Sequence, residues 1–517
     1  MFNILAFFCG LLISPAEAQT CPTRPLGDSS NACASTAFVN QFGTGTTSGA
    51  VIPNLPVIGN ATSNGFTQGT RSGNTTDYGT VNGTLTNGDC VSIDSNGNLV
   101  DAGAACGTIA SGTTGQMAGY STNGSAIVGV NECLNAQLYG ANGNGSTDNA
   151  SVWTALVAAV GNNGCIYFPS GKYKFSTGSA YTFTEAGCLT IRGDGSEVTK
   201  LYWPNSAGGL NITAAYSTNC AHIRDLSLTT GVANGGTALN LSASYSNGGG
   251  IPPTSDIYNV TTRGDDYTPN TSSTDYWTIG TNISAWSNWT IINLNGYSPW
   301  QSPGSSGNGV GLEIGGTGTS AYATVINVLS SSFNFYTYGI ALESYWQGVT
   351  INQTNFNGEV GNNGIIQAGS ASGTLGTLVV SNSEFAYYNG PQISILSATN
   401  NMQFTNNLIT QAVNSTVGIN VSAPFFGFQA TNNMFNSVSF GSFPTGWYGI
   451  GLNGSAEAGG NASGNFCLGQ SGAKLNTCVS LGSGTSSLTA TGNSAINLTG
   501  STVGNSGTNN VLGNNTP

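Results

Sequence analysis

The chain of 517 residues contains 76 glycines but only 21 acidic residues and 9 Lys or Arg, which gives a formal net charge of −12. So small a charged fraction excludes a set of amphipathic helices solubilised by charge, and it favours an all-β fold with Asn, Ser and Thr on its outer faces. The scarcity of Lys and Arg argues against nucleic acid or anionic lipid as a partner, because phosphate binding requires clustered cations.

The N-terminus is predicted to be a signal peptide over residues 1–18. An apolar run from Ile4 to Ile13 precedes Ala16 and Ala18, which have the small-x-small spacing of a cleavage site. No Lys or Arg precedes the run, so a short buried strand is the alternative. No segment of the sequence reaches the ~20 apolar residues that span a bilayer. These features predict export without a membrane span.

The cysteines also indicate export. Removal of Cys9 with the signal peptide would leave ten of the 11 cysteines, an even number. Close spacing predicts bridges between Cys21 and Cys33, Cys90 and Cys106, and Cys467 and Cys478. Two more would join Cys133, Cys165, Cys188 and Cys220 in a pairing that the sequence leaves open. Zinc binding is the alternative, but there is no CxxC motif and His222 is the only histidine, so no metal and no cofactor are predicted.

Residues 19–130 are rich in Gly, Ser, Thr and Asn and are predicted to form a stem or linker. Within them, residues 23–41 and 87–107 resemble short segments of phage tail fibre and tailspike proteins. The resemblance implies a homotrimer on a phage virion tail, whereas the signal peptide predicts ordinary secretion to the outside of the cell.

Residues 131–470 are predicted to form a solenoid that opens with a capping helix. Asp148 is the predicted N-cap of a helix that runs to Val160 and carries one apolar stripe. The segment from YGANGNGSTDN to CIYFPSGKY, within residues 138–176, resembles the opening of the pectate-lyase-like superfamily of polysaccharide lyases, polygalacturonases and phage tailspikes. That resemblance implies a right-handed, single-stranded parallel β-helix. The pattern departs from the family at Asn144 and Asn149, where Asp is usual.

A recurring five-residue phrase predicts stacked coils. Its copies begin at 236, 309, 339, 364, 418 and 449, with a degenerate copy at 391, and their second and fourth residues are usually apolar. A coil of about 27 residues gives roughly ten coils, with the fifth residue of each copy pointing outward. Residues 471–517 are predicted to be a polar, low-complexity tail that forms either a last ragged coil or disordered chain.

Glu313 and Glu343 occupy the fifth position of successive copies and are the predicted catalytic pair. If the copies align, the two Cα atoms stand one strand spacing apart, about 4.8 Å. Carboxyl groups that close raise one pKa and can act as the acid and the base or nucleophile of a glycosidase. The alternative is an exposed ladder position without a role. Competing acids are Asp265, Asp266, Glu359 and Glu384; the Asp pair could instead bind a metal ion or cap a turn.

Aromatic residues concentrate near these acids and predict a sugar-binding groove, because flat rings stack on sugar faces. The candidates are Trp277, Trp286, Trp289, Trp300, Tyr345 and Trp346. Packing in the core is the alternative for about half of the aromatic residues. Together the patterns predict a protein that binds a polysaccharide and depolymerises it by glycoside hydrolysis. The alternatives are a lyase, which would need an Arg or Lys base, and a non-catalytic adhesin or receptor-binding spike.

Overall fold

The computed structural model describes residues 133–245, 251–268, 273–299, 308–358, 363–369, 376–386, 389–411, 417–437, 447–454, 456–470 and 474–517, and six strands nearer the N-terminus. The chain divides into two units, 1–111 and 112–517. The six strands form antiparallel hairpins: β1 (Val57–Gly59) with β2 (Phe66–Gln68), β3 (Asp89–Ile93) with β4 (Leu99–Ala105), and β5 (Met117–Tyr120) with β6 (Ile127–Val130). The predicted signal peptide lies outside the described residues, as do Cys21, Cys33 and Cys106.

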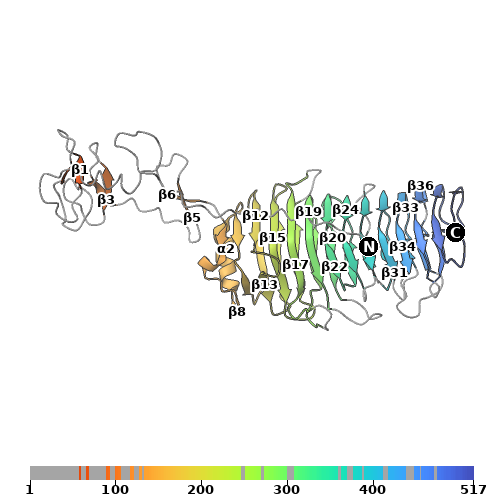
Figure 1. Ribbon diagram of the computed structural model, residues 1–517, viewed down its shortest axis with the longest axis horizontal. Helices are drawn as coiled ribbons and strands as arrows, with labels where there is room; N and C mark the ends of the chain where they lie inside the picture. Colours follow the sequence, from red (N-terminus) through yellow and green to blue (C-terminus); the bar gives the residue numbers. More distant parts are fainter. Residues whose placement is uncertain are drawn as a thin grey trace, which may run out of the picture. The chain divides into compact units, whose positions relative to one another are not determined.

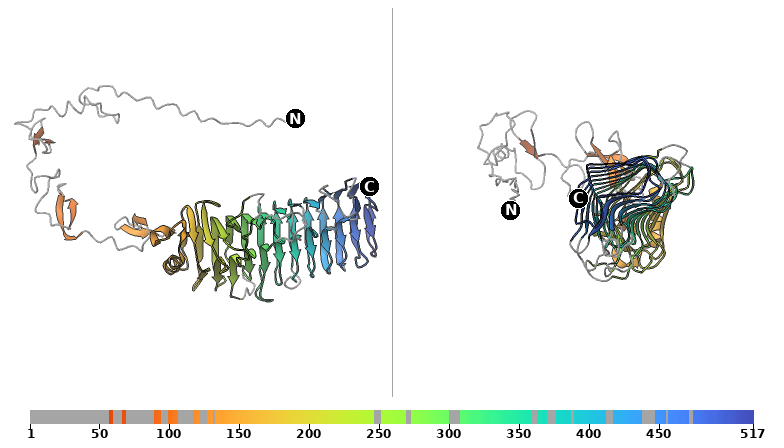
Figure 2. Two further views of the ribbon diagram at one scale, coloured as in Figure 1. Left: turned by 90° about the horizontal axis from the view of Figure 1, so that it is seen from below. Right: turned by 90° about the vertical axis from the view of Figure 1, so that its right-hand side faces the viewer.

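From Leu134 onward the second unit is a β-helix whose coils stack from the helix α2 at one end to β42 at the other (Figure 1). Seen along its axis, the coils superimpose on one outline (Figure 2). The chain passes in each coil through three faces, named here face 1, face 2 and face 3 in chain order. Every strand pairing between successive coils is parallel, and the predicted right-handed parallel β-helix is confirmed.

Face 3 is a 12-stranded sheet. Its strands are β11 (Ser179–Thr182), β14 (Leu210–Ala214), β16 (Thr237–Ala243), β18 (Ile279–Ser284), β20 (Val310–Gly315), β23 (Tyr338–Leu342), β26 (Asn363–Gln367), β29 (Ile393–Ile395), β32 (Val417–Val421), β35 (Trp447–Leu452), β38 (Leu475–Leu481) and β41 (Val503–Asn505).

Faces 1 and 2 join into one 24-stranded sheet because three long strands run through both. These are β15 (Cys220–Thr230), β17 (Ser255–Gly264) and β19 (Trp289–Tyr297). The other strands of face 1 are β7 (Leu134–Asn135), β9 (Cys165–Tyr167), β12 (Cys188–Arg192), β21 (Ile326–Leu329), β24 (Val349–Asn352), β27 (Leu378–Ser381), β30 (Met402–Thr405), β33 (Phe425–Thr431), β36 (Ala456–Ser463), β39 (Leu488–Thr491) and β42 (Val511–Gly513). Those of face 2 are β8 (Asn144–Asp148), β10 (Gly171–Lys174), β13 (Thr199–Trp203), β22 (Ser332–Asn334), β25 (Asn355–Asn357), β28 (Glu384–Ala386), β31 (Leu408–Gln411), β34 (Met434–Ser437), β37 (Phe466–Leu468) and β40 (Ser494–Ile496).

The corner between face 1 and face 2 is a single residue in the left-handed region. It has a positive φ in nine successive or nearly successive coils: Asp225, Asn259, Asn293, Ser330, Gln353, Asn382, Asn406, Asn432 and Asn514. Asn and Asp tolerate this conformation better than other residues with a Cβ, because their short polar side chains bond locally. The repeated corner keeps the bend at the same place in each coil.

From the Asn406 corner onward, the residue after the corner is an asparagine, and the side chains of these asparagines form an internal ladder in which Asn407, Asn433, Asn465 and Asn493 are buried. The amides of Asn407, Asn433, Asn465 and Asn493 each donate to the side-chain oxygen of the next member, over 2.9–3.0 Å, and the last acceptor is Asn515. Each also donates to a backbone carbonyl, as Asn433 does to Phe404. Buried amides are stable here because they are paired.

The helix α2 (Ala150–Val160) covers the first coil and ends where the sequence predicts. Its buried residues are Trp153 and Leu156, and it follows the 3-10 helix η1 (Ala136–Tyr139). The N-cap is Asn149, one residue after the predicted Asp148. Asp148 still supports this end of the helix, since its Oδ1 accepts hydrogen bonds from the backbone N–H groups of Ala150 (3.2 Å) and Ser176 (2.9 Å).

The solenoid continues beyond the predicted boundary at residue 470. Strands β38 to β42 pair in register with the coils before them, so of the two forms predicted for the tail it is the coil, and not disordered chain, that is found over residues 474–517. The inward residues of these coils include small ones, such as Ala490 and Ala495, both 1% exposed or less. Small core residues make the segment look low in complexity, although it fills the same apolar column.

Three disulfides lie within the described residues. Cys467–Cys478 confirms a predicted pair, and the open pairing resolves to Cys133–Cys165 and Cys188–Cys220. Cys188 and Cys220 are directly opposed on neighbouring strands of face 1, with Cα atoms 4.5 Å apart. Among the described residues, no helix has the length and apolar character needed to cross a bilayer.

Candidate active site

The two predicted catalytic acids lie on face 3 but not at the same position of successive strands. Strand pairing places Glu313 of β20 beside Ala341, so that Glu343 follows the end of β23 and lies two residues further along. A Cβ built on Gly315 would lie 2.9 Å from the Cβ of Glu343, which fixes Gly315 as its neighbour. The predicted in-register pair is therefore wrong.

Buried apolar residues set this register. Leu312 faces Ile340 and Ile314 faces Leu342, and all four side chains are fully buried. The first residue of the copy at 339 therefore lies opposite Gly311, and not opposite Gly309, the first residue of the preceding copy. One strand spacing of about 4.8 Å and a rise of about 6.6 Å over two residues place the Cα atoms of Glu313 and Glu343 about 8 Å apart.

The two acids remain electrostatically linked at this separation. Glu313 is half-buried and Glu343 is exposed. Burial raises the pKa of Glu313 above its usual range, and the neighbouring charge of Glu343 raises it further. A half-buried carboxyl group with a raised pKa beside an exposed carboxyl group is the arrangement that separates an acid from a base in many hydrolases.

An uncharged lane of amides leads along face 3 to Glu313. Asn211, Asn240, Asn282 and Glu313 occupy one outward position of four successive strands. The amide of Asn282 donates to the side-chain oxygen of Asn240 over 2.8 Å. Amide side chains both donate and accept hydrogen bonds, so this lane can follow the hydroxyl groups of a neutral chain.

The predicted tryptophan platform is core instead of surface. Trp277, Trp286, Trp289 and Trp346 are each 1% exposed or less, which excludes them from contact with a bound sugar. Trp286 packs edge-on against Trp289 with ring centroids 5.1 Å apart. All four rings belong to the hydrophobic core, Trp289 as the first residue of β19 and the others between strands. Trp300 lies outside the described residues.

Two tyrosines at the corner beyond Glu343, Tyr345 and Tyr322, are partly exposed. They belong to adjacent coils, since an isolated bridge joins Ala323 to Trp346, and both border Gly316. Of the predicted sugar-binding residues, Tyr345 alone keeps an exposed ring among those described.

The other described acids among the predictions either make structural contacts or lie on another face. Asp265 pairs with Lys172 (2.6 Å). Asp266 accepts hydrogen bonds from the backbone N–H groups of Thr274 (2.7 Å) and Asp275 (3.2 Å), so it closes its own loop. Burial, and then the charges of Asp266 and Asp265, raise the pKa of Asp275. Glu384 is exposed on face 2, and Glu359 lies outside the described residues.

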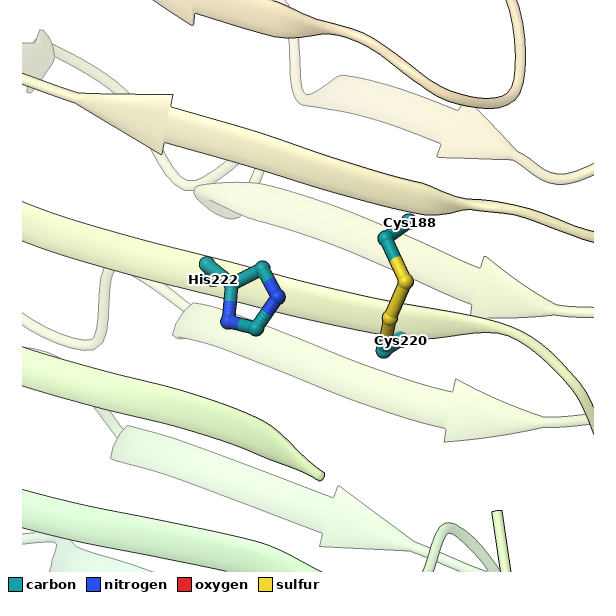
Figure 3. A group of neighbouring side chains, drawn as sticks. All are labelled: Cys188, Cys220 and His222. Carbon is teal, nitrogen blue, oxygen red and sulfur yellow. A yellow bond between two sulfur atoms is a disulfide. The ribbon is translucent and has the colours of Figure 1, made fainter. Parts of the chain in front are cut away.

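One described cluster has the composition of a metal site. Ligand atoms of Cys188, Cys220 and His222 lie within 4.8 Å of one another (Figure 3). The two sulfur atoms are joined in a disulfide, which removes both thiolates. The imidazole Nδ1 of His222 instead contacts Asp256, whose carboxylate also receives Arg224. Sequence reasoning missed this group, because His222 and Asp256 become neighbours only once the register of face 1 is known.

Comparison with known proteins gives only distant similarity. No family model matches the sequence, and no curated protein is similar to it. Among solved structures, a family 28 exopolygalacturonase of Yersinia enterocolitica is 13% identical, with 75% of this chain and 79% of that chain covered and a TM-score of 0.42. The surface protein and adhesin PfbA of Streptococcus pneumoniae is 11% identical (74% and 99% covered, TM-score 0.39). ORF18 of Geobacillus virus E2 is 12% identical (78% and 68% covered, TM-score 0.35). Such similarity carries no argument about activity, and the fold rests on the strand pairing itself.

Proposed function

We propose that the protein binds a polysaccharide along face 3 and hydrolyses a glycosidic bond with Glu313 as the general acid and Glu343 as the base. The observation that carries this proposal is the raised pKa of the half-buried Glu313 beside the exposed Glu343. The amide lane from Asn211 to Asn282 provides neutral hydrogen-bonding groups for a sugar chain.

The proposed reaction is hydrolysis with inversion, which the separation of the two acids allows. Inverting glycosidases hold their carboxyl groups ~6.5–9.5 Å apart so that a water molecule fits between one of them and the sugar. Glu side chains that start from Cα atoms about 8 Å apart can place their carboxyl groups within that range. Glu313 would give its proton to the glycosidic oxygen as the bond to the anomeric carbon breaks. Glu343 would take a proton from the water that attacks that carbon, and a new reducing end would result.

The disulfides support a location in an oxidising compartment, either secreted or on a virion. A homotrimer of tailspike type is part of the same proposal. Light scattering of the full chain should then report three copies. A monomer at all concentrations would contradict the homotrimer and leave the proposal for the site unchanged.

Incubation with a panel of bacterial surface glycans tests the function. New reducing ends without unsaturated-uronate absorbance are expected. The Glu313→Gln and Glu343→Gln variants should each lose roughly 100-fold or more of that activity, the usual contribution of a general acid or base. Glu384→Gln, which removes an exposed acid from face 2, is the matched control.

The other outcomes identify the alternatives. Unsaturated-uronate absorbance would indicate a lyase, although the described strands of face 3 contain no Lys or Arg to act as its base. Binding without cleavage on every glycan would indicate an adhesin, for which the amide lane alone suffices. Cleavage retained by both Gln variants would show that the acids are wrongly assigned.

A further inference from the structure

The first coils of face 1 carry a row of aromatic and cationic residues that the proposed function does not use. Strand pairing places Tyr167, Arg192, Arg224 and Tyr258 at one position of four successive strands. Because successive strands lie about 4.8 Å apart, two arginines stand side by side between two tyrosines. This row is called the arginine row below.

The two arginines differ in what they contact. The Nε and Nη2 of Arg224 donate to the two oxygens of Asp256, both over 2.7 Å, and His222 contacts the same carboxylate. Arg192 is exposed, and its guanidinium lies 5.2 Å from the ring centroid of Tyr167. No described carboxylate or carbonyl accepts a hydrogen bond from Arg192. A guanidinium stacked on a ring keeps its edge N–H groups free for an acceptor such as a carboxylate.

A pocket of about 360 Å³ adjoins the arginine row. It is lined by Arg224, Thr254, Asp256, Ile257, Tyr258, Thr290 and Ile292. Tyr258 is 47% exposed although its side chain is large and apolar. A ring, an aliphatic side chain and two threonine hydroxyls together suit a sugar ring, which has an apolar face and hydroxyl edges.

Surrounding acids limit the charge of the ligand. Asp256 pairs with Arg224 and is the main reason that the pKa of Arg224 is raised, the charge of Asp225 adds to this effect, and Asp194 accepts a hydrogen bond from the hydroxyl of Tyr167. These three carboxylates repel a dianion such as a phosphate about twice as strongly as a single carboxylate, whose one charge the unpaired Arg192 can match.

We propose that face 1 holds a second carbohydrate site, which binds an acidic oligosaccharide with a uronate carboxylate at Arg192 and the adjoining sugar ring in the pocket beside Arg224 and Tyr258. The site lies on a different face from Glu313 and does not depend on the proposed hydrolysis. It adds a preference for uronate-containing chains that the amide lane of face 3 cannot provide, because that lane carries no cation.

Calorimetric titration of the full chain with a tetrasaccharide of alternating glucuronate and N-acetylglucosamine tests the site. Saturable binding is expected, and the same tetrasaccharide with its carboxyl groups reduced to alcohols should bind at least tenfold more weakly. Arg192→Gln should weaken binding at least tenfold, and Tyr258→Ala should do the same by removing the ring that the sugar covers. Both side chains are exposed, so an unchanged thermal unfolding midpoint should show that these variants fold.

Lys474→Gln is the matched control, since it removes an exposed cation at the far end of the solenoid and should leave binding unchanged. Four results would overturn the proposal: no binding of the tetrasaccharide, equal binding of its reduced form, unchanged binding by both Arg192→Gln and Tyr258→Ala, or equally tight binding of hexaglutamate. The last would assign the arginine row to acidic peptides. Because the measurement is binding by the intact protein, its result is independent of whether Glu313→Gln abolishes cleavage.

Discussion

Replacing Asn433 by Ala tests how far the internal amide ladder stabilises the distal coils. The Asn433 side chain accepts hydrogen bonds from the backbone N (3.1 Å) and Nδ2 (2.9 Å) of Asn407, and it donates to the Phe404 carbonyl (2.9 Å) and to Asn465 (3.0 Å). Alanine would deprive the Asn407 N–H and the Phe404 carbonyl of these bonds inside the core, at roughly 1–3 kcal/mol for each unsatisfied group. The expected loss is about 4 kcal/mol in the local free energy of opening.

Hydrogen exchange is the appropriate assay, because coils that contact only their neighbours open locally. A loss of about 4 kcal/mol corresponds to roughly 700-fold faster exchange of the amides in β30 and β31. Gln403→Ala changes an exposed residue of β30 and should alter exchange by less than about threefold. If the folded Asn433→Ala variant exchanges less than tenfold faster, or no faster than the control, the ladder does not stabilise these coils as argued.

Three further results follow from the structure. The pKa of Glu313 is raised in the folded protein, so the folded state loses stability as the pH rises above 4.5, the ordinary pKa of a glutamate. Denaturant titration should therefore find the Glu313→Gln variant more stable than the parent at pH 7. The difference should be gone below about pH 4. Replacing Cys188 and Cys220 by Ser removes a disulfide that joins residues 32 positions apart, and it should lower the free energy of unfolding by about 3–4 kcal/mol. Denaturant titration measures this loss, and an unchanged midpoint would argue against the disulfide. Trp286→Ala should lower the free energy of unfolding by about 3–5 kcal/mol and leave glycan binding by the folded protein intact. A selective loss of binding would instead indicate that this ring contacts the glycan.

The sequence allowed the fold class to be predicted but not the register at the candidate site. Alternating apolar residues mark which side of a strand faces inward, so a slip of one residue is excluded. A slip of two residues keeps the same side chains inside and leaves no trace in the pattern. Around Gly311 the choice depends on packing, since a Cβ there would lie 2.5 Å from the ring of Phe333. That contact joins Gly311 of face 3 to Phe333 of face 2, so the pattern within one strand does not reveal it.

The aromatic residues show a second limit of sequence reasoning. A tryptophan in a coil corner and a tryptophan on a binding face have the same polar neighbours in the sequence, because both interrupt the alternation of a strand. Trp286 and Trp346 lie in the segments after strands β18 and β23 of face 3 and are fully buried, whereas Tyr345 stays partly exposed. The difference depends on which way the chain turns at the corner, and that turn is set by residues such as Ala285, which has a positive φ.

The repeated left-handed corner makes the solenoid adjustable in length. Asn382 and Asn406 hold the same corner of adjacent coils and are 24 residues apart. Excision of residues 383–406 would join two equivalent points of the chain, so the strands on either side would meet partners of the same pattern. We expect insertions and deletions of whole coils to be tolerated here, without disturbing either the capped end or the acids of face 3. Selection could thus lengthen or shorten the protein in steps of one coil while its chemistry stays fixed.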